Sequence, residues 1–254
     1  MDRRPRRFYG AYVFDLDGTV YLGDRLLPGA GETIARLRGL GRPLIFLSNN
    51  PLHTRRAYAA KLTALGVPTP EDAVINSSYV LVRHLTSEAP KARLLVIGEA
   101  SVKAELREAG FVLTDDAAQT EVVVACFDRT FDYRKLQAAF DAIRGGARFI
   151  ATNRDPYCPV PGGGLPDCGA IIAAIEACTG HAVEEVVGKP SRIMARVILE
   201  RVGVPAPECL MVGDRLETDL ALARAAGMAS AIVLSGATDE VALARWPERP
   251  DFVL

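Results

Sequence analysis

The sequence YVFDLDGT at residues 12–19 decides how the rest of the chain is interpreted. Its apolar start predicts a buried strand. Asp15 and Asp17 follow two residues apart, so their side chains can point the same way. Gly18 permits a tight turn away from the strand. In doubly wound parallel sheets, ligands bind beyond the carboxyl ends of the strands. The stretch therefore predicts a polar site where a parallel strand ends.

Two carboxylates this close repel each other, and a bound cation relieves the repulsion. An all-oxygen ligand set suits Mg²⁺. The pattern Asp-x-Asp also occurs in many ordinary turns. On its own, the pair Asp15 and Asp17 leaves both a turn and a metal site open.

The rest of the chain alternates short apolar runs with stretches of helical period, which is typical of βα units and a parallel sheet. We therefore predict an α/β fold with a doubly wound, Rossmann-like core. Ser191 is placed to cap the helix that follows it. We expect core strands over residues 12–14, 43–47, 209–212 and 231–234, and core helices over 28–40, between Pro51 and Gly66, 192–202 and 218–226.

A second series of βα units lies between these two halves. Its own alternating pattern indicates that it buries its own core. We predict an inserted α/β domain over residues 80–186, with the core domain formed by residues 1–79 and 187–254. The insert is expected to contain strands over residues 93–97, 122–127 and 148–152, and helices over 100–109, 133–144 and 168–179.

Three further polar segments follow the predicted core strands or the insert. Ser48, Asn49 and Asn50 come directly after the strand at 43–47. A hydroxyl and the amides of a strand-to-helix turn can hold phosphate oxygens. Serine and asparagine are equally common as helix caps. Both interpretations of this segment stay open.

Lys189 stands between Gly188 and Pro190, ahead of a predicted helix. Such a lysine is a compact cation that can neutralise phosphate charge, or it is an ordinary surface lysine. Asp214 ends the strand at 209–212 and can complete the ligand set of a cation. Asp219 begins the next helix, where it either favours the positive helix end or supports a metal site through its neighbours.

Composition excludes several classes of protein. The chain has 30 basic and 31 acidic residues, and a dedicated nucleic-acid binder would carry a basic excess. No apolar run approaches the roughly 18 residues that span a membrane. Five cysteines without a CxxC pair argue against a disulfide framework and against a zinc site with paired ligands. We expect reduced thiols, a cytoplasmic protein, and neither nucleic acid nor a membrane as partner.

Two smaller expectations concern potential ligands and reactive groups. Cys158 and Cys168 fall in a loop-rich stretch, where exposure is expected. The scattered histidines, His53, His84 and His181, are interpreted as surface residues and not as ligands.

The polar segments occur in a fixed order and together resemble the four motifs of the haloacid dehalogenase-like phosphatase superfamily. The insert lies between the second and third motifs, as in the C2-capped members. Further stretches resemble the NagD and 4-nitrophenylphosphatase subfamily. The superfamily motifs match residues 15–19, 47–50, 188–190 and 213–219, and the subfamily features match residues 15–24, 28–30, 128–136 and 151–155.

The resemblance implies a role for each residue of the first motif. Asp15 would be the nucleophile that attacks phosphorus and becomes an aspartyl phosphate. Asp17 would protonate the leaving oxygen and then activate water for the second step. The carboxylates of Asp15 and Asp214 and the backbone carbonyl of Asp17 would hold Mg²⁺, with Asp219 ordering the metal's surroundings.

The resemblance also implies a phosphate- and substrate-binding set. Ser48 with neighbouring amides and Lys189 would bind the phosphoryl oxygens. Asn153 and Asp155 would lie in a loop of the insert that faces the active site, although an Asx-type turn before Pro156 remains the alternative. The complete expected set is Gly18, Ser48, Asn49, Asn50, Lys189, Asn153 and Asp155.

The leading hypothesis is a Mg²⁺-dependent phosphatase for small phosphate monoesters of the nucleotide, sugar phosphate, glycerol phosphate or phosphoglycolate type. One alternative is a catalytically inactive module that binds a phosphorylated metabolite. Another is a phosphotransferase or mutase on the same fold. The resemblance further implies a cap that excludes solvent and reads the leaving group, and a possible homodimer through the cap.

Overall fold

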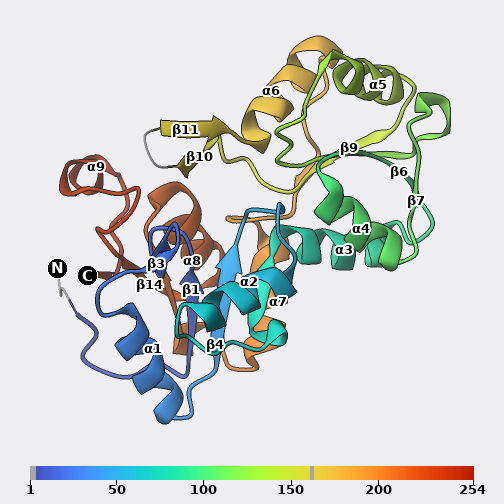
Figure 1. The fold of residues 1–254 in the computed structure, drawn as a ribbon. Coiled ribbons are helices and arrows are strands. Elements are labelled where there is room, and N and C mark those ends of the chain that lie inside the picture. Colours follow the sequence, from blue (N-terminus) through green and yellow to red (C-terminus); the bar gives the residue numbers. More distant parts are fainter. Residues whose placement is uncertain (1–3, 161–162) are drawn as a thin grey trace. The chain divides into compact units, whose positions relative to one another are not determined.

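The computed structural model describes residues 4–160 and 163–254, which form two compact units (Figure 1). The first unit contains residues up to 48, 55–75 and 189–254. The second contains residues 49–54 and 76–188. Each unit has its own sheet and its own apolar core.

The first unit is built on a six-stranded sheet in the order β15-β14-β13-β1-β4-β5. β1 lies in its interior, parallel to β13 on one side and to β4 on the other. Tyr12 of β1 is paired with Leu210 and with Leu44. The strands are β1 (Ala11–Asp15), β4 (Leu44–Ser48), β5 (Val74–Asn76), β13 (Cys209–Gly213), β14 (Ala229–Ile232) and β15 (Phe252–Val253).

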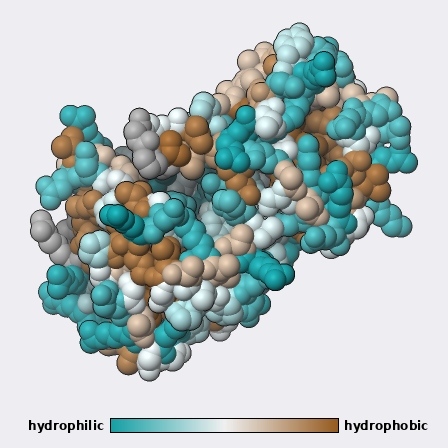
Figure 2. All heavy atoms as spheres, in the orientation of Figure 1, coloured by the Kyte–Doolittle hydropathy of each residue, from teal (hydrophilic) through white to brown (hydrophobic). Residues whose placement is uncertain are grey.

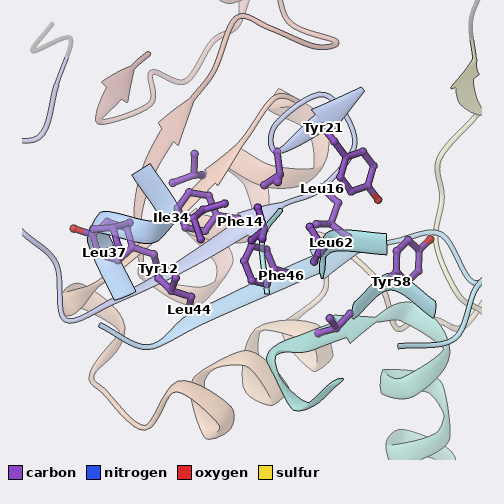
Figure 3. Close-up of a cluster of buried hydrophobic side chains, with 14 of the residues drawn as sticks. Tyr12, Phe14, Leu16, Tyr21, Ile34, Leu37, Leu44, Phe46, Tyr58 and Leu62 are labelled. Atoms are coloured by element: carbon purple, nitrogen blue, oxygen red, sulfur yellow. The ribbon is translucent and has the colours of Figure 1, made fainter. Parts of the chain in front are cut away.

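Helices bury both faces of this sheet, so β1 is apolar throughout without alternation. On one face, Phe14 of β1 stacks on Phe46 of β4 with ring centroids 6.2 Å apart. Ile34 of α1 and Leu62 of α2 complete this cluster (Figure 3). The helices of the unit are α1 (Ala30–Gly39), α2 (Arg55–Ala64), α7 (Arg192–Val202), α8 (Ala221–Ala226) and α9 (Glu240–Arg245).

The second unit has a five-stranded parallel sheet in the order β12-β9-β8-β6-β7. An antiparallel hairpin, β10 (Tyr157–Val160) and β11 (Gly163–Pro166), follows β9. The sheet strands are β6 (Arg93–Ile97), β7 (Val112–Leu113), β8 (Val122–Ala125), β9 (Arg148–Ala151) and β12 (Glu185–Val186). The helices are α3 (Ser77–Glu88), α4 (Ala100–Glu108), α5 (Tyr133–Arg144) and α6 (Cys168–Thr179).

The α/β fold with parallel sheets is confirmed, and the elements that sequence missed are short or lack a clear apolar period. These are β5, α3 and the two hairpins, of which the first joins β2 (Tyr21–Leu22) to β3 (Arg25–Leu26). The strand expected at 231–234 lies at 229–232. The helix expected from residue 218 begins with a π-helical turn, η4 (Leu216–Leu220), before α8.

Two expectations about side chains were wrong. His84 is not a surface residue, because it lies on the inner face of α3 and its Nε2 is 2.5 Å from Glu185 Oε2. Cys168 is not exposed, because it is the first residue of α6 and packs into the core of the second unit. Helical structure was the missing information in both cases, since it sets which side of the chain faces inward.

Hydrophilic residues spread over the visible surface of both units, with apolar residues between them (Figure 2). Among the helices of the described residues, none combines the length and the apolar character needed to cross a membrane.

Ser191 caps α7, as its position in the sequence predicts. Its Oγ accepts a hydrogen bond of 3.1 Å from the backbone N–H of Met194. Ser191→Ala removes this acceptor and should lower the free energy of unfolding by about 1 kcal/mol, which corresponds to a drop of about 2–4 °C in the thermal midpoint. Ser191→Asp retains an acceptor and should melt with the wild type. An unchanged midpoint for the alanine variant would contradict the assignment.

Candidate active site

Three buried aspartates meet at the carboxyl edge of the first unit's sheet. Asp15 is the last residue of β1, and Asp214 follows the neighbouring parallel strand β13 directly. Parallel neighbours end at the same edge, which brings the two side chains together. Asp219 joins them from η4. One carboxylate oxygen from each residue lies within 4.8 Å of the others, and all three residues are buried.

The ammonium group of Lys189 lies inside this cluster. Its Nζ is 2.5 Å from Asp15 Oδ1 and 2.7 Å from Asp219 Oδ1, and the residue is only 4% exposed. Burial alone would lower the pKa of Lys189, but the two carboxylates outweigh it and hold this pKa above its usual value. Lys189 therefore stays charged and offsets one of three buried acidic groups.

The remaining excess of acid shifts the titration of the aspartates. Burial raises the pKa of Asp15 well above its usual range, against the attraction of Lys189. Burial, and then the charge of Asp219, raises the pKa of Asp214 to about 6. Three carboxylates beside one ammonium group form a donor set of oxygens with excess negative charge, which fits a divalent cation.

Asp219 is held by the backbone that carries Asp214. Its Oδ2 accepts hydrogen bonds from the N–H groups of Asp214 (3.1 Å) and Arg215 (3.0 Å). A Cβ on Gly213 would collide with the Asp219 carboxylate, so only glycine allows this close approach. The π-helical turn thus positions Asp219 under the end of β13.

A loop that sequence reasoning missed surrounds Asp214. The N–H of Ala237 donates to Asp214 Oδ2 at 2.6 Å, and the N–H of Thr238 donates to the Asp214 carbonyl at 3.1 Å. A Cβ on Gly236 would overlap the same carboxylate. Ser235 Oγ donates to the Gly18 carbonyl at 2.8 Å. The available signal was the small, polar stretch after a core strand, the same signal that identified the other segments.

The turn after β1 places Gly18 against Asp214. Gly18 has φ 86°, and a Cβ there would lie 2.5 Å from Asp214 Oδ2. Its N–H donates to the Tyr21 carbonyl at 2.8 Å, which leads the chain into the hairpin β2–β3. Asp17 is exposed, and its carboxylate lies outside the cluster formed by the other three aspartates.

The second predicted segment is divided between the two units. Ser48 ends β4, is buried, and lies with its Oγ 3.4 Å from Tyr58 Oη of α2. Asn49 belongs to the second unit, where its Nδ2 donates to Asp155 Oδ2 at 3.0 Å. Asn50 accepts a hydrogen bond from the N–H of Leu52 at 2.9 Å, which closes a local turn.

Asn153 and Asp155 form a cluster with Asn49 in the second unit. Asn153 is fully buried, and its Nδ2 donates to Asp155 Oδ2 and to Asp167 Oδ1, both at 3.1 Å. The predicted site residues thus form two groups. One group is Asp15, Asp214, Asp219 and Lys189 in the first unit, and the other is Asn49, Asn153 and Asp155 in the second.

The chain matches a family of known proteins at both of its ends. Residues 12–112 match the haloacid dehalogenase-like hydrolase family, and residues 186–254 match a related HAD-hydrolase-like family. The first match covers the strand that carries Asp15. The second covers Lys189, Asp214 and Asp219.

Full-length relatives extend this similarity to almost the whole chain. The sugar-phosphatase AraL of Bacillus subtilis is 36% identical over 95% of this chain and 88% of its own length. A 4-nitrophenylphosphatase from Thermotoga maritima superimposes with a TM-score of 0.93 at 37% identity, covering 97% and 94% of the two chains. NagD from E. coli K-12 superimposes with a TM-score of 0.88 at 30% identity, covering 97% and 96%. With this fold and these carboxylates, the chain belongs to the haloacid dehalogenase-like hydrolases, in the subfamily of NagD and the 4-nitrophenylphosphatases.

Proposed function

We propose that this protein is a Mg²⁺-dependent phosphatase that hydrolyses small phosphate monoesters through an aspartyl phosphate. The observation that carries the proposal is the buried Asp15 carboxylate, which lies 2.5 Å from the Lys189 ammonium group and beside two further carboxylates. A nucleophile, a fixed cation and a cation-binding set therefore meet at the end of one strand. Relatives with phosphatase names support the same reaction class.

Asp15 is the nucleophile in this proposal. Its carboxylate oxygen forms a bond to phosphorus while the bond from phosphorus to the ester oxygen breaks, and the electron pair leaves with that oxygen. Lys189 favours the ionised form of Asp15 that this attack requires. The same ammonium group is placed to bind phosphoryl oxygens as charge shifts towards them.

Asp17 supplies and recovers the proton. It is exposed and two residues beyond the nucleophile, so it can reach a leaving group that Asp15 displaces. It gives its proton to the ester oxygen in the first step. It then takes a proton from the water that attacks the aspartyl phosphate, which releases phosphate and restores Asp15.

The carboxylates of Asp15 and Asp214 and the carbonyl of Asp17 would hold the Mg²⁺ ion, whose bound charge would neutralise the phosphoryl group. Asp219 orients this set, because it binds both the backbone at Asp214 and the Lys189 ammonium group.

The phosphoryl oxygens would also contact Ser48, which is buried at the end of β4, and the neighbouring backbone. The turn at Gly18 leaves room for this group. We expect sugar phosphates, nucleotides, glycerol phosphate and phosphoglycolate as candidate substrates. The second unit would act as the cap that selects among them, and a homodimer through the cap is part of the same proposal.

Asp15→Asn is the most direct test of the proposed reaction. An amide is a poor nucleophile, so kcat should fall by about 10⁴-fold or more. The assay is release of 4-nitrophenolate from 4-nitrophenyl phosphate with Mg²⁺ present. Asp132→Asn is the matched control, because asparagine can still cap α5 from this exposed position. Substantial turnover by the Asp15 variant would exclude Asp15 as the nucleophile.

Lys189→Met tests the charge balance of the site. It leaves three buried carboxylates without their cation, which should lower the free energy of unfolding at pH 7 by about 3–5 kcal/mol. Urea denaturation with and without Mg²⁺ measures the effect, and Mg²⁺ should restore part of the loss. Lys91→Met, at an exposed position, should change little. If the two variants unfold at the same urea concentration, Lys189 does not stabilise the cluster.

Affinity for Mg²⁺ should fall as the pH is lowered through about 6. The reason is the raised pKa of Asp214, because the ion binds the deprotonated carboxylate and protons compete for it below this pKa. Isothermal titration with Mg²⁺ between pH 7.5 and 5 should show up to about tenfold weaker binding per pH unit. Asp214→Asn should bind weakly throughout. Affinity that is constant across this range would count against Asp214 as a ligand.

A further inference from the structure

Four residues of the second unit form a hydrogen-bonded cluster next to both places where the chain passes between the units. We call Asn49, Asn153, Asp155 and Gly188 the crossing clamp. Asn49 is joined by one peptide bond to Ser48, and Gly188 by one peptide bond to Lys189. Ser48 and Lys189 are the two residues to which the proposed function assigns phosphoryl binding.

A single carboxylate oxygen holds the first crossing. Asp155 Oδ2 accepts from Asn49 Nδ2 at 3.0 Å and from Asn153 Nδ2 at 3.1 Å. Asn153 is anchored in turn to Asp167, whose Oδ1 also accepts from the backbone N–H of Cys168 and so caps α6. The amide of Asn49 is thereby tied to the start of a helix in the core of the second unit.

The second crossing packs against the same amide. The N–H of Gly188 donates to the Thr152 carbonyl at 2.8 Å. A Cβ on Gly188 would lie 2.7 Å from Asn49 Oδ1 and would also collide with the Thr152 carbonyl. Ser77 Oγ donates to the Asn49 carbonyl at 2.5 Å and fixes the backbone of the first crossing. The two crossings are therefore held side by side.

The chemistry of the clamp favours positioning over substrate binding. Asn153 is fully buried and its side-chain N–H groups already bind two carboxylates. A carboxylate such as Asp155 repels a phosphate dianion, so it is a poor direct ligand for the phosphoryl group. The same carboxylate is a strong acceptor for two neutral amides.

We propose that Asp155 is a positioning residue that holds Asn49 beside Gly188 and thereby keeps Ser48 and Lys189 in the register that binds the phosphoryl group. The inference rests on the proposed phosphatase function. It assigns to Asp155 an effect that is common to all substrates, because every phosphate ester presents the same phosphoryl oxygens. A residue that reads the leaving group would instead affect substrates unequally.

The experiment measures the Asp155→Ala variant with three ligands. These are 4-nitrophenyl phosphate, a sugar phosphate, and inorganic phosphate as a competitive inhibitor, which has no leaving group. We expect the KM of both esters and the inhibition constant of phosphate to rise together, by about tenfold to a hundredfold. Asp155→Asn keeps one acceptor oxygen and should fall between the alanine variant and the wild type.

Asp128→Ala is the matched control. Asp128 is another buried carboxylate of the second unit, and it accepts hydrogen bonds from Thr130 and Lys135. Its loss should lower thermal stability but leave the inhibition constant of phosphate at the wild-type value. A variant that acts only through instability of the second unit would resemble this control.

Three outcomes overturn the inference. They are an unchanged phosphate inhibition constant in Asp155→Ala, unequal effects on the two esters, and the same change in Asp128→Ala. If Asp155→Ala does not fold, Gly188→Ala disturbs the clamp from the other side and must raise the phosphate inhibition constant. A wild-type protein that hydrolyses neither ester would instead reject the proposed function, so the two failures are distinguishable.

Discussion

The site depends on one buried ammonium group, that of Lys189, placed among the carboxylates of three aspartates. Opposite charges about 4 Å apart attract by about 4 kcal/mol at the effective dielectric constant of a protein surface, and the attraction grows with burial. Lys189 contacts Asp15 and Asp219 directly. One cation cannot offset three acids, so the site retains negative charge. That imbalance makes it a place where a divalent ion binds and where a phosphoryl group meets both a nucleophile and a positive charge.

Glycine makes this crowding of charge geometrically possible. Side chains at Gly18 and Gly236 would overlap the Asp214 carboxylate, and one at Gly213 would overlap Asp219. Each of these glycines lies at or just beyond the carboxyl end of a core strand, where the chain turns away. The backbone can therefore approach the aspartates closely enough to donate hydrogen bonds to them, as Ala237 does to Asp214. The loops contribute polar groups and the strands contribute position.

Much of the fold and the acidic part of the candidate site follow from the sequence. The runs around Val13, Ile45 and Met211 are apolar because both faces of the sheet are covered, and the polar segments stand where those runs end. The loop at residues 235–238 was missed because it binds Asp214 mainly through backbone groups, which carry no residue signature. The buried position of His84 was missed because it depends on which face of α3 packs inward.

The sequence by itself determined the parallel α/β architecture and the identity of the acids and the lysine that meet at the strand ends. Apolar periodicity and the chemistry of charged side chains are local properties, so they can be read along the chain. Only the tertiary structure decided that Asn49 is bonded to Asp155 across 106 positions in the sequence, and that the two crossings of the chain pack together at Gly188. Such pairs depend on how distant segments are brought together in space, and a neutral amide is compatible with many partners until packing selects one.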